Sequence, residues 1–254
     1  MVVRFLGTGT SQGVPLIGCN CNVCASTNTK DKRLRSSIFV AHKGTNIVID
    51  TGADFRQQML RENIDRIDGI VYTHEHKDHL AGMDEVRAFN FKTGKAINLY
   101  ATERVQNAIR AEFAYIFADT KYPGIPQINF NTISHKNEFK VENITLTPIH
   151  VMHAQLPVLG FRIENFTYIT DANYINETEL EKIKGTDVLV LNALRREEHI
   201  SHFTLQQALD LVKIINPRIA YFTHISHQLG THNELKNELP HNVFLAYDGL
   251  VINC

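Results

Sequence analysis

Short apolar runs alternate with helical patterns along most of the chain. Runs rich in β-branched and aromatic residues predict strands. They lie at 2–7, 36–42, 46–52, 69–74, 96–102, 144–151, 158–164, 166–172, 186–194 and 218–226, and two closing strands lie within 241–253. Apolar residues at helical spacing predict helices at 54–63, 82–92, 103–117, 176–184 and 204–215. The "YPGIP" stretch at 122–126 predicts a loop.

This order of elements gives two β-rich halves with helices between and after the strands. Two sheets packed face to face and flanked by helices would use these elements well, which places the chain in the α/β class. A length of 254 residues suits one large domain or two small ones. Because no linker, repeat or low-complexity tract interrupts the pattern, we predict one domain spanning 1–254.

Composition and charge narrow the class of protein. Hydrophobic residues make up 43% and charged residues 21%, which is ordinary for a soluble globular protein. The net charge of −1 gives no sign of a nucleic-acid partner or an anionic membrane surface. The apolar runs are too short to span a bilayer. The start "MVVRFLGTGTS" lacks the pattern of a secretory signal, so we predict a cytoplasmic protein without a membrane partner.

Histidine or aspartate follows three of the predicted strands directly. After the strand near 73 comes "THEHKDH", in which His74 and His76 point to the same side of extended backbone. Asp78 and His79 follow after a turn. Imidazole nitrogen and carboxylate oxygen suit zinc, manganese or iron, so this stretch can serve two metals. A solvated histidine-rich turn is the alternative, and the compact spacing after a buried strand argues against it.

At this point "THEHKDH" resembles the H-x-H-x-D-H signature of the metallo-β-lactamase superfamily. The resemblance implies an αββα four-layer sandwich, two divalent metal ions at one edge of the sheets, and three further ligands. His153 fits the mid-chain histidine better than His150, whose part in the site stays open. Asp171 in "TYITDAN" and His224 in "YFTHISH" fit the other two positions. Taken alone, Asp171 would be read as a turn or helix-cap residue.

The resemblance also distributes these ligands between the two metals, which would be zinc, manganese or iron. The first metal would be bound by His74, His76 and His153. The second would be bound by Asp78, His79 and His224. Asp171 would bridge both. Asp50, in "IVIDTG", would stand behind the ligands and orient an imidazole.

Three of the four cysteines crowd into "GCNCNVC". Cys19, Cys21 and Cys24 supply three thiolates, one fewer than a tetrahedral zinc site needs. His227, three residues after His224, is the candidate fourth ligand of one structural zinc ion. Three buried small hydrophobic residues or a redox pair are the alternatives, but only a metal explains all three cysteines together.

The cysteine loop, "THEHKDH" and "SHFTLQQAL" together resemble the phosphoribosyl cyclic phosphodiesterase family of the carbon–phosphorus lyase pathway. This resemblance covers nearly the whole chain and implies a small phosphodiester substrate and a homodimer. Relatives with the cysteine loop include a cofactor-biosynthesis protein. "GTGTSQG" is not a dinucleotide fingerprint, because its glycines are spaced one residue too far apart and Pro15 follows instead of a helix.

The expected reaction is attack on phosphorus by a hydroxide that bridges two metals. Asp78 and His202 are the candidate catalytic residues, and His202 would act as general acid or stabilise the transition state. Its alternative role is that of a helix N-terminal residue. Three rival functions stay open: a transfer-RNA 3′-end endonuclease, a thioester or lactam hydrolase, and a metal-binding accessory protein of cofactor biosynthesis. The nuclease typically carries a polybasic arm, and this sequence shows none.

Overall fold

The computed structural model describes residues 1–119 and 123–254. Its strands form two large sheets. The first sheet runs in the order β15 (Val251–Asn253), β1 (Val2–Gly7), β2 (Ser37–His42), β3 (Thr45–Ile49), β4 (Gly69–Val71), β5 (Ile97–Ala101) and β6 (Ile128–Thr132). The second runs in the order β11 (Tyr174–Ile175), β8 (Ile144–His153), β9 (Leu156–Ile163), β10 (Phe166–Ile169), β12 (Val188–Asn192), β13 (Ile219–Thr223) and β14 (Val243–Leu245). A short strand, β7 (Phe139–Val141), pairs with β8.

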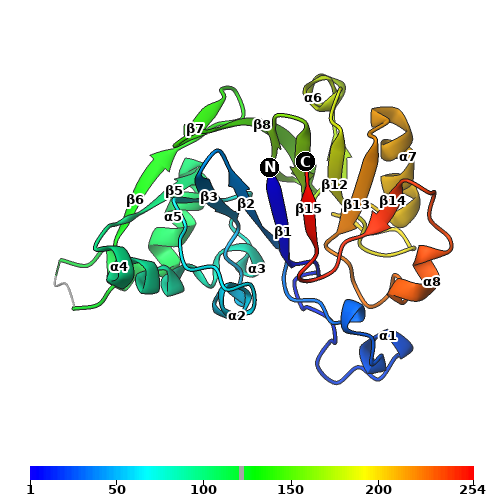
Figure 1. Ribbon diagram of the computed structural model, residues 1–254, viewed down its shortest axis with the longest axis horizontal. Coiled ribbons are helices and arrows are strands. Elements are labelled where there is room, and N and C mark those ends of the chain that lie inside the picture. The colour runs from blue at the N-terminus through cyan, green and yellow to red at the C-terminus, as the bar shows by residue number, and fades with distance from the viewer. Residues whose placement is uncertain (120–122) are drawn as a thin grey trace.

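The helices cover the outer faces of the sheets, as Figure 1 shows. The first sheet carries α2 (Phe55–Arg61), α3 (Lys77–Leu80), α4 (Arg87–Thr93) and α5 (Glu103–Glu112). The second sheet carries α6 (Glu177–Ile183), α7 (Leu205–Ile215) and α8 (His232–Lys236). The small helix α1 (Asn22–Ala25) stands apart, at the end of the molecule where β1 finishes. Three 3₁₀ turns complete the described helices, at Thr29–Asp31, Met83–Val86 and Ala114–Ile116.

Three apolar layers hold this arrangement together. Between the sheets, Phe5 and Val71 of the first pack in one cluster with Phe161 and Tyr168 of the second, and all four are fully buried. A second cluster joins the first sheet to its helices, and a third joins the other sheet to α6, α7 and α8. Helix, sheet, sheet and helix therefore follow one another, which confirms the predicted αββα sandwich.

Local sequence sets the helix boundaries. Helix α7 begins where the Thr204 hydroxyl accepts from the backbone N–H of Gln207 and the Gln207 side chain accepts in return from Thr204 N–H. Its apolar residues at helical spacing, such as Ala208 and Val212, are buried against the second sheet. It ends at Asn216, whose left-handed backbone closes the helix.

Parallel strands bring the site together. In the first sheet β3, β4, β5 and β6 are parallel, and in the second β10, β12, β13 and β14 are parallel. Because parallel strands end at the same edge of a sheet, the residues that follow β3, β4, β10 and β13 meet. Of the predicted loop at 122–126, Tyr122 lies outside the described residues. Within the described residues, no helix combines the length and apolarity that crossing a membrane requires.

Candidate metal centre

Two groups of nitrogen and oxygen donors lie at the shared strand edge. In each group the donor atoms lie within 4.8 Å of one another. The first group consists of His74, His76, His153 and Asp171. The second consists of Asp78, His79, Asp171 and His224. The sequence predicted these same seven residues with the same division, and Asp171 belongs to both groups. Their role as metal ligands stays a prediction.

Chain segments far apart in sequence supply these side chains. His74 follows β4, and His76 stands at the N-terminal cap of α3, whose first turn carries Asp78. In the second sheet Asp171 follows β10, and His224 follows β13. His153 is the last residue of β8. Every donor is thus attached to the end of a rigid element, which fixes its position better than a long loop would.

Three residues at these strand ends have left-handed backbone. The φ angles are 66° at Asp50, 55° at Asp171 and 54° at His224. Residues other than glycine rarely adopt this conformation, although aspartate tolerates it better than most. At each position the chain turns sharply out of the strand. Strained backbone conformations of this kind are often found at functional sites, where the surrounding structure stabilises them.

One buried carboxylate orients two of the imidazoles. Asp50 Oδ2 accepts from His79 Nδ1 at 2.7 Å and from the Thr73 hydroxyl at 2.8 Å. Because the Thr73 proton points to Asp50, its oxygen can only accept, and His74 Nδ1 donates to it at 2.9 Å. Both imidazoles therefore carry a proton on Nδ1 and direct Nε2 to the centre.

The same tautomer holds at His153. Its Nδ1 lies 2.7 Å from the backbone oxygen of Ser201, which can only accept a hydrogen bond. The Nδ1 atom therefore donates, and Nε2 is left free. Three imidazoles of the centre thus use Nδ1 for an outer hydrogen bond and direct Nε2 inward, the atom that would bind a metal after giving up any proton it carries.

The spacing of the donors suits an ion. His79 Nε2 lies 3.2 Å from Asp171 Oδ2 and 3.1 Å from Asp78 Oδ2, and His74 Nε2 lies 3.0 Å from His76 Nδ1. Ligands bound tetrahedrally at about 2.1 Å from zinc stand about 3.4 Å apart. Buried Asp78 Oδ2 and His79 Nε2 have no hydrogen-bond partner among the described residues. Buried polar atoms are normally paired, so the residues present fit divalent metals.

The buried charged groups of the centre shift one another's pKa values. Burial alone would raise the pKa of Asp171, but His224 and His79 hold that pKa well below its usual value. Burial alone would lower the pKa of His79, but Asp171, Asp78 and Asp50 hold it well above its usual value. Burial lowers the pKa of His74, which keeps that imidazole neutral. The carboxylates are therefore ionised at neutral pH, as ligands of a cation must be.

His202 lies against both groups without belonging to either. Its Nε2 stands 3.5 Å from Asp171 Oδ2, and its ring stacks on that of His224 with centroids 4.8 Å apart. The side chain is buried, and burial lowers its pKa to about 4. His202 comes two residues before Thr204, the N-cap of α7, so it is not itself the cap. The sequence did not single out its neighbour His199, although "HISH" places two histidines three residues apart.

His150 lies outside the centre. Its ring packs on His135 with centroids 4.9 Å apart, and its backbone N–H donates to Glu179. With Arg104 and His135 it lines a neighbouring cavity of about 450 Å³. Of the two histidines considered from the sequence, His153 is therefore the one placed with the donors.

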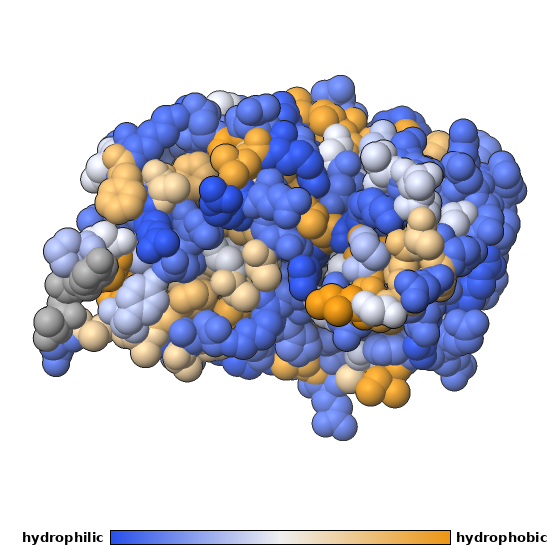
Figure 2. All heavy atoms as spheres, turned by 90° about the horizontal axis from the view of Figure 1, so that it is seen from below, coloured by the Kyte–Doolittle hydropathy of each residue, from blue (hydrophilic) through white to orange (hydrophobic). Residues whose placement is uncertain are grey.

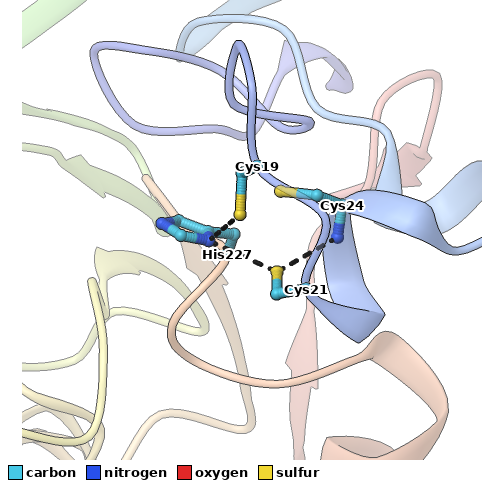
Figure 3. Close-up of side chains that lie close together, drawn as sticks. All are labelled: Cys19, Cys21, Cys24 and His227. Atoms are coloured by element: carbon cyan, nitrogen blue, oxygen red, sulfur yellow. Dashed lines mark hydrogen bonds between the residues drawn. The ribbon is translucent and has the colours of Figure 1, made fainter.

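The cysteine loop forms a separate group, shown in Figure 3. Cys19, Cys21, Cys24 and His227 lie with their ligand atoms within 4.8 Å of one another, as predicted. His227 Nδ1 is 3.4 Å from the sulfurs of both Cys19 and Cys21. A backbone hydrogen bond from Cys24 is the main cause that lowers the pKa of Cys21 to about 6. All four cysteines are free thiols. Three sulfurs and one imidazole make a donor set typical of zinc.

Comparison with known proteins settles the family. A family model described as a beta-lactamase superfamily domain matches residues 45–225, which carry all seven donors of the metal centre. The chain belongs to the metallo-β-lactamase superfamily. Its resemblance to that superfamily, inferred from "THEHKDH", is confirmed.

Among metallo-β-lactamase proteins, a crystal structure of a new diphosphatase from the PhnP family is similar along the full chain. It shares 39% identity at a TM-score of 0.92, covering 100% of this chain and 97% of that one. An octanoyltransferase of Porphyromonas gingivalis is 38% identical over 97% of this chain and 50% of its own length. A ribonuclease Z of Staphylococcus epidermidis is 27% identical over 65% of this chain and 49% of its own. The chain spans about half the length of these curated relatives.

The surface around a metallo-β-lactamase centre decides which substrates approach it. Figure 2 looks at the molecule from the side where α1 and α3 lie in Figure 1. This face is mainly hydrophilic, and hydrophobic side chains appear on it in separate groups. Among the exposed apolar residues are Ile17 on the cysteine loop and Ile200 beside His199.

Proposed function

We propose that the chain is a dinuclear metal-dependent hydrolase of small phosphodiesters, cyclic ones included. The observation that carries the proposal is the position of Asp171, which belongs to two donor groups at once. A carboxylate shared in this way suits two ions about 3.5–4 Å apart, the arrangement typical of phosphoester hydrolysis. The likeness to a diphosphatase of the PhnP family supports a phosphorus-centred reaction.

Each residue then has a separate task. Two divalent cations, when bound, would polarise the phosphoryl group and lower the pKa of a water molecule. The six histidine and aspartate ligands other than Asp171 hold those ions, and Asp50 orients His74 and His79. His202 faces the reacting atoms through Nε2. Because its resting imidazole is neutral, it must first gain a proton at Nε2 before it can protonate the leaving oxygen.

The first prediction tests the shared carboxylate. Asp171→Ala should lower the turnover of bis(p-nitrophenyl) phosphate by more than about 100-fold. Replacing a residue that only hydrogen-bonds to a metal ligand typically lowers metal affinity or activity by about 10–100-fold, and replacing the ligand itself should lower activity further. Metal content should fall in the same variant. Asp210→Ala is the matched control, because Asp210 is an exposed residue of α7 paired with Lys213. An Asp171→Ala enzyme that is replete in metal and fully active would refute the assignment.

A second candidate is hydrolysis of an acyl thioester, in which the same activated water would attack a carbonyl carbon. The name of the P. gingivalis relative, octanoyltransferase, favours it, although this chain matches only half of that protein. A panel of bis(p-nitrophenyl) phosphate, a cyclic ribose phosphodiester, a diester of diphosphate and an octanoyl thioester separates the two. Precursor transfer RNA added to the panel tests the nuclease alternative that the ribonuclease Z relative raises.

The cysteine group, we propose, binds one structural zinc ion, and the centre binds zinc, manganese or iron. Three free thiols close together fit a reducing compartment, which agrees with a cytoplasmic location. A protein that holds metal only at the cysteines, with the histidine centre unable to bind any, would instead support the accessory-protein alternative. Metal analysis of purified protein distinguishes these cases.

A further inference from the structure

His199 is the histidine beside the centre that the proposed reaction does not use. It lies half-buried on the segment between β12 and α7, and its donor atoms belong to neither metal group. Its Nδ1 accepts from the backbone N–H of Ser201 at 3.3 Å. Since a backbone N–H can only donate, His199 Nδ1 carries a lone pair, and the ring proton of His199 is on Nε2.

That lone pair constrains His202. The Nδ1 atoms of His199 and His202 are 3.2 Å apart. Two lone pairs facing each other at this distance would repel, so the proton between them must belong to His202 Nδ1. Ser201 Oγ, 3.1 Å from His202 Nδ1 and 3.2 Å from His199 Nδ1, fits the same pattern. It can accept from His202 Nδ1.

The other nitrogen of His202 is then free of hydrogen. His202 Nε2 faces Asp171 and has no hydrogen-bond partner among the described residues, although it is buried. A bare nitrogen opposite a carboxylate needs a proton donor or a cation between them. A water molecule or a hydroxyl group of the substrate would supply that donor.

We propose that His199 is a positioning residue that holds His202 in the Nδ1–H tautomer, so that Nε2 enters the reaction as an acceptor. This inference rests on the proposed hydrolysis. In that reaction the O–H bond of the attacking water breaks and its proton forms a bond to His202 Nε2, while oxygen bonds to phosphorus. As the bond from phosphorus to the leaving oxygen breaks, the Nε2 proton passes to that oxygen. His202 returns to its starting tautomer, and no other reactant is needed.

Four hydrogen bonds hold the segment without the His199 side chain, which itself accepts from the Ser201 backbone N–H. Asn173 Nδ2 donates to the backbone oxygen of Ile200, and His153 Nδ1 donates to that of Ser201. The backbone N–H of Leu194 donates to Phe203 and that of Phe203 donates to Ala172. Because the anchors belong to other residues and His199 is half-buried, replacing its side chain should leave a folded protein with normal metal content.

Two substitutions test whether His199 acts as a hydrogen-bond acceptor or only fills space. In His199→Asn the side-chain oxygen Oδ1 can take the place of Nδ1 and accept from His202. His199→Leu keeps similar bulk but accepts nothing. We expect His199→Leu to lower kcat by about 100-fold, the lower end of what general acid–base catalysis contributes, with KM unchanged. His199→Asn should retain most of the kcat. His241→Leu, at an exposed histidine, is the control that should change neither constant.

Nitrogen-15 NMR of the histidine rings gives a readout that needs no substrate. In the wild type and in His199→Asn, His202 should carry its proton on Nδ1, whereas in His199→Leu the Nε2–H form should appear. A wild-type His202 protonated on Nε2, or a His199→Leu variant with unchanged tautomer and kcat, would overturn the proposal. If no substrate of the panel is hydrolysed, the proposed function fails, and the NMR spectra still decide the role of His199.

Discussion

Asp50 is the residue on which the geometry of the centre depends most, although it is not a predicted ligand. Its carboxylate contacts His79 directly and His74 through the Thr73 hydroxyl, and these two imidazoles belong to different donor groups. Its Oδ1 also accepts from the backbone N–H of Thr73 at 2.9 Å. One side chain therefore sets the tautomers on both sides of the centre. Burial raises its pKa, and the hydrogen bonds from His79 and Thr73 reduce that rise without cancelling it.

Asp50→Asn is therefore expected to weaken metal binding at both positions. The amide keeps the shape of the carboxylate, but its NH₂ group accepts no hydrogen bond, so either His79 and the Thr73 hydroxyl or the Thr73 N–H loses its acceptor. Loss of such an outer partner typically lowers metal affinity by about 10–100-fold. Competition with a chelator, followed for zinc, measures the change. Asp65→Asn, an exposed carboxylate paired with Lys92, should bind zinc like the wild type. Equal affinities for Asp50→Asn and the wild type would remove Asp50 from this role.

At this scale the sequence predicted which residues meet but not how they are oriented. The H-x-H-x-D-H spacing pointed to His74, His76, Asp78 and His79, and the resemblance to the superfamily supplied the other three donors. The left-handed backbone at Asp171 and His224 was not predicted, although aspartate and histidine adopt it more often than most residues other than glycine. The contact between His199 and His202 depends on the path of an irregular segment, which hydrophobic periodicity does not describe.

At the scale of elements, the cysteine loop is the part of the fold with the least apolar support. Its own cluster of buried apolar residues consists of Val14, Val23 and Cys24. The helix α1 that carries Cys24 is four residues long, too short to be stable alone. The loop is therefore expected to depend on bound zinc for its shape.

Cys21→Ser tests this dependence. We expect the variant to lose one equivalent of zinc and to be cleaved faster by protease within residues 10–35, while the metals of the histidine centre remain. The reason is that the loop lacks a core that could replace the metal. Cys254→Ser is the matched control, since Cys254 is a free thiol far from this group in sequence. A Cys21→Ser protein with unchanged zinc content and protease resistance would show that no structural zinc is held there.

Most long elements were predicted from the sequence, and the short ones were missed. Helix α7 was predicted to within one residue, because its capping box and apolar spacing agree. Strand β6, "INFNT", was missed because it lies at the sheet edge and has little apolar character. Strand β11 has two residues and α8 has five, so neither is long enough to show a regular spacing of apolar residues. The predicted strand at 46–52 stops at Ile49, because Asp50 turns the backbone out of the sheet.

At the scale of the whole molecule, a buried polar network ties the chain termini to the sandwich. Asp248, in the crossing from β14 to β15, accepts from the Thr8 hydroxyl, the Leu34 backbone N–H and Arg61. Buried Arg33 donates to Thr8 and to the backbone oxygen of Ala246. Burial lowers the pKa of Arg33 to about 10, yet it stays charged at neutral pH. Four segments distant in sequence, and with them both sheets, therefore share one set of hydrogen bonds.

Asp248→Ala should consequently destabilise the whole sandwich. It would remove one of the two carboxylates, with Asp31, whose charge favours the buried Arg33 guanidinium, and it would leave the Leu34 N–H unpaired. A buried donor left without a partner costs about 1–3 kcal/mol. For a chain of this size that corresponds to a fall in Tm of about 2–12 °C. Asp187→Ala, which removes an exposed ion pair with Arg218, is the matched control and should leave Tm nearly unchanged. Urea unfolding should show one transition in both variants, as one domain requires. If Asp248→Ala costs no more than Asp187→Ala, the network does not join the sheets, and a second transition would mean that they unfold separately.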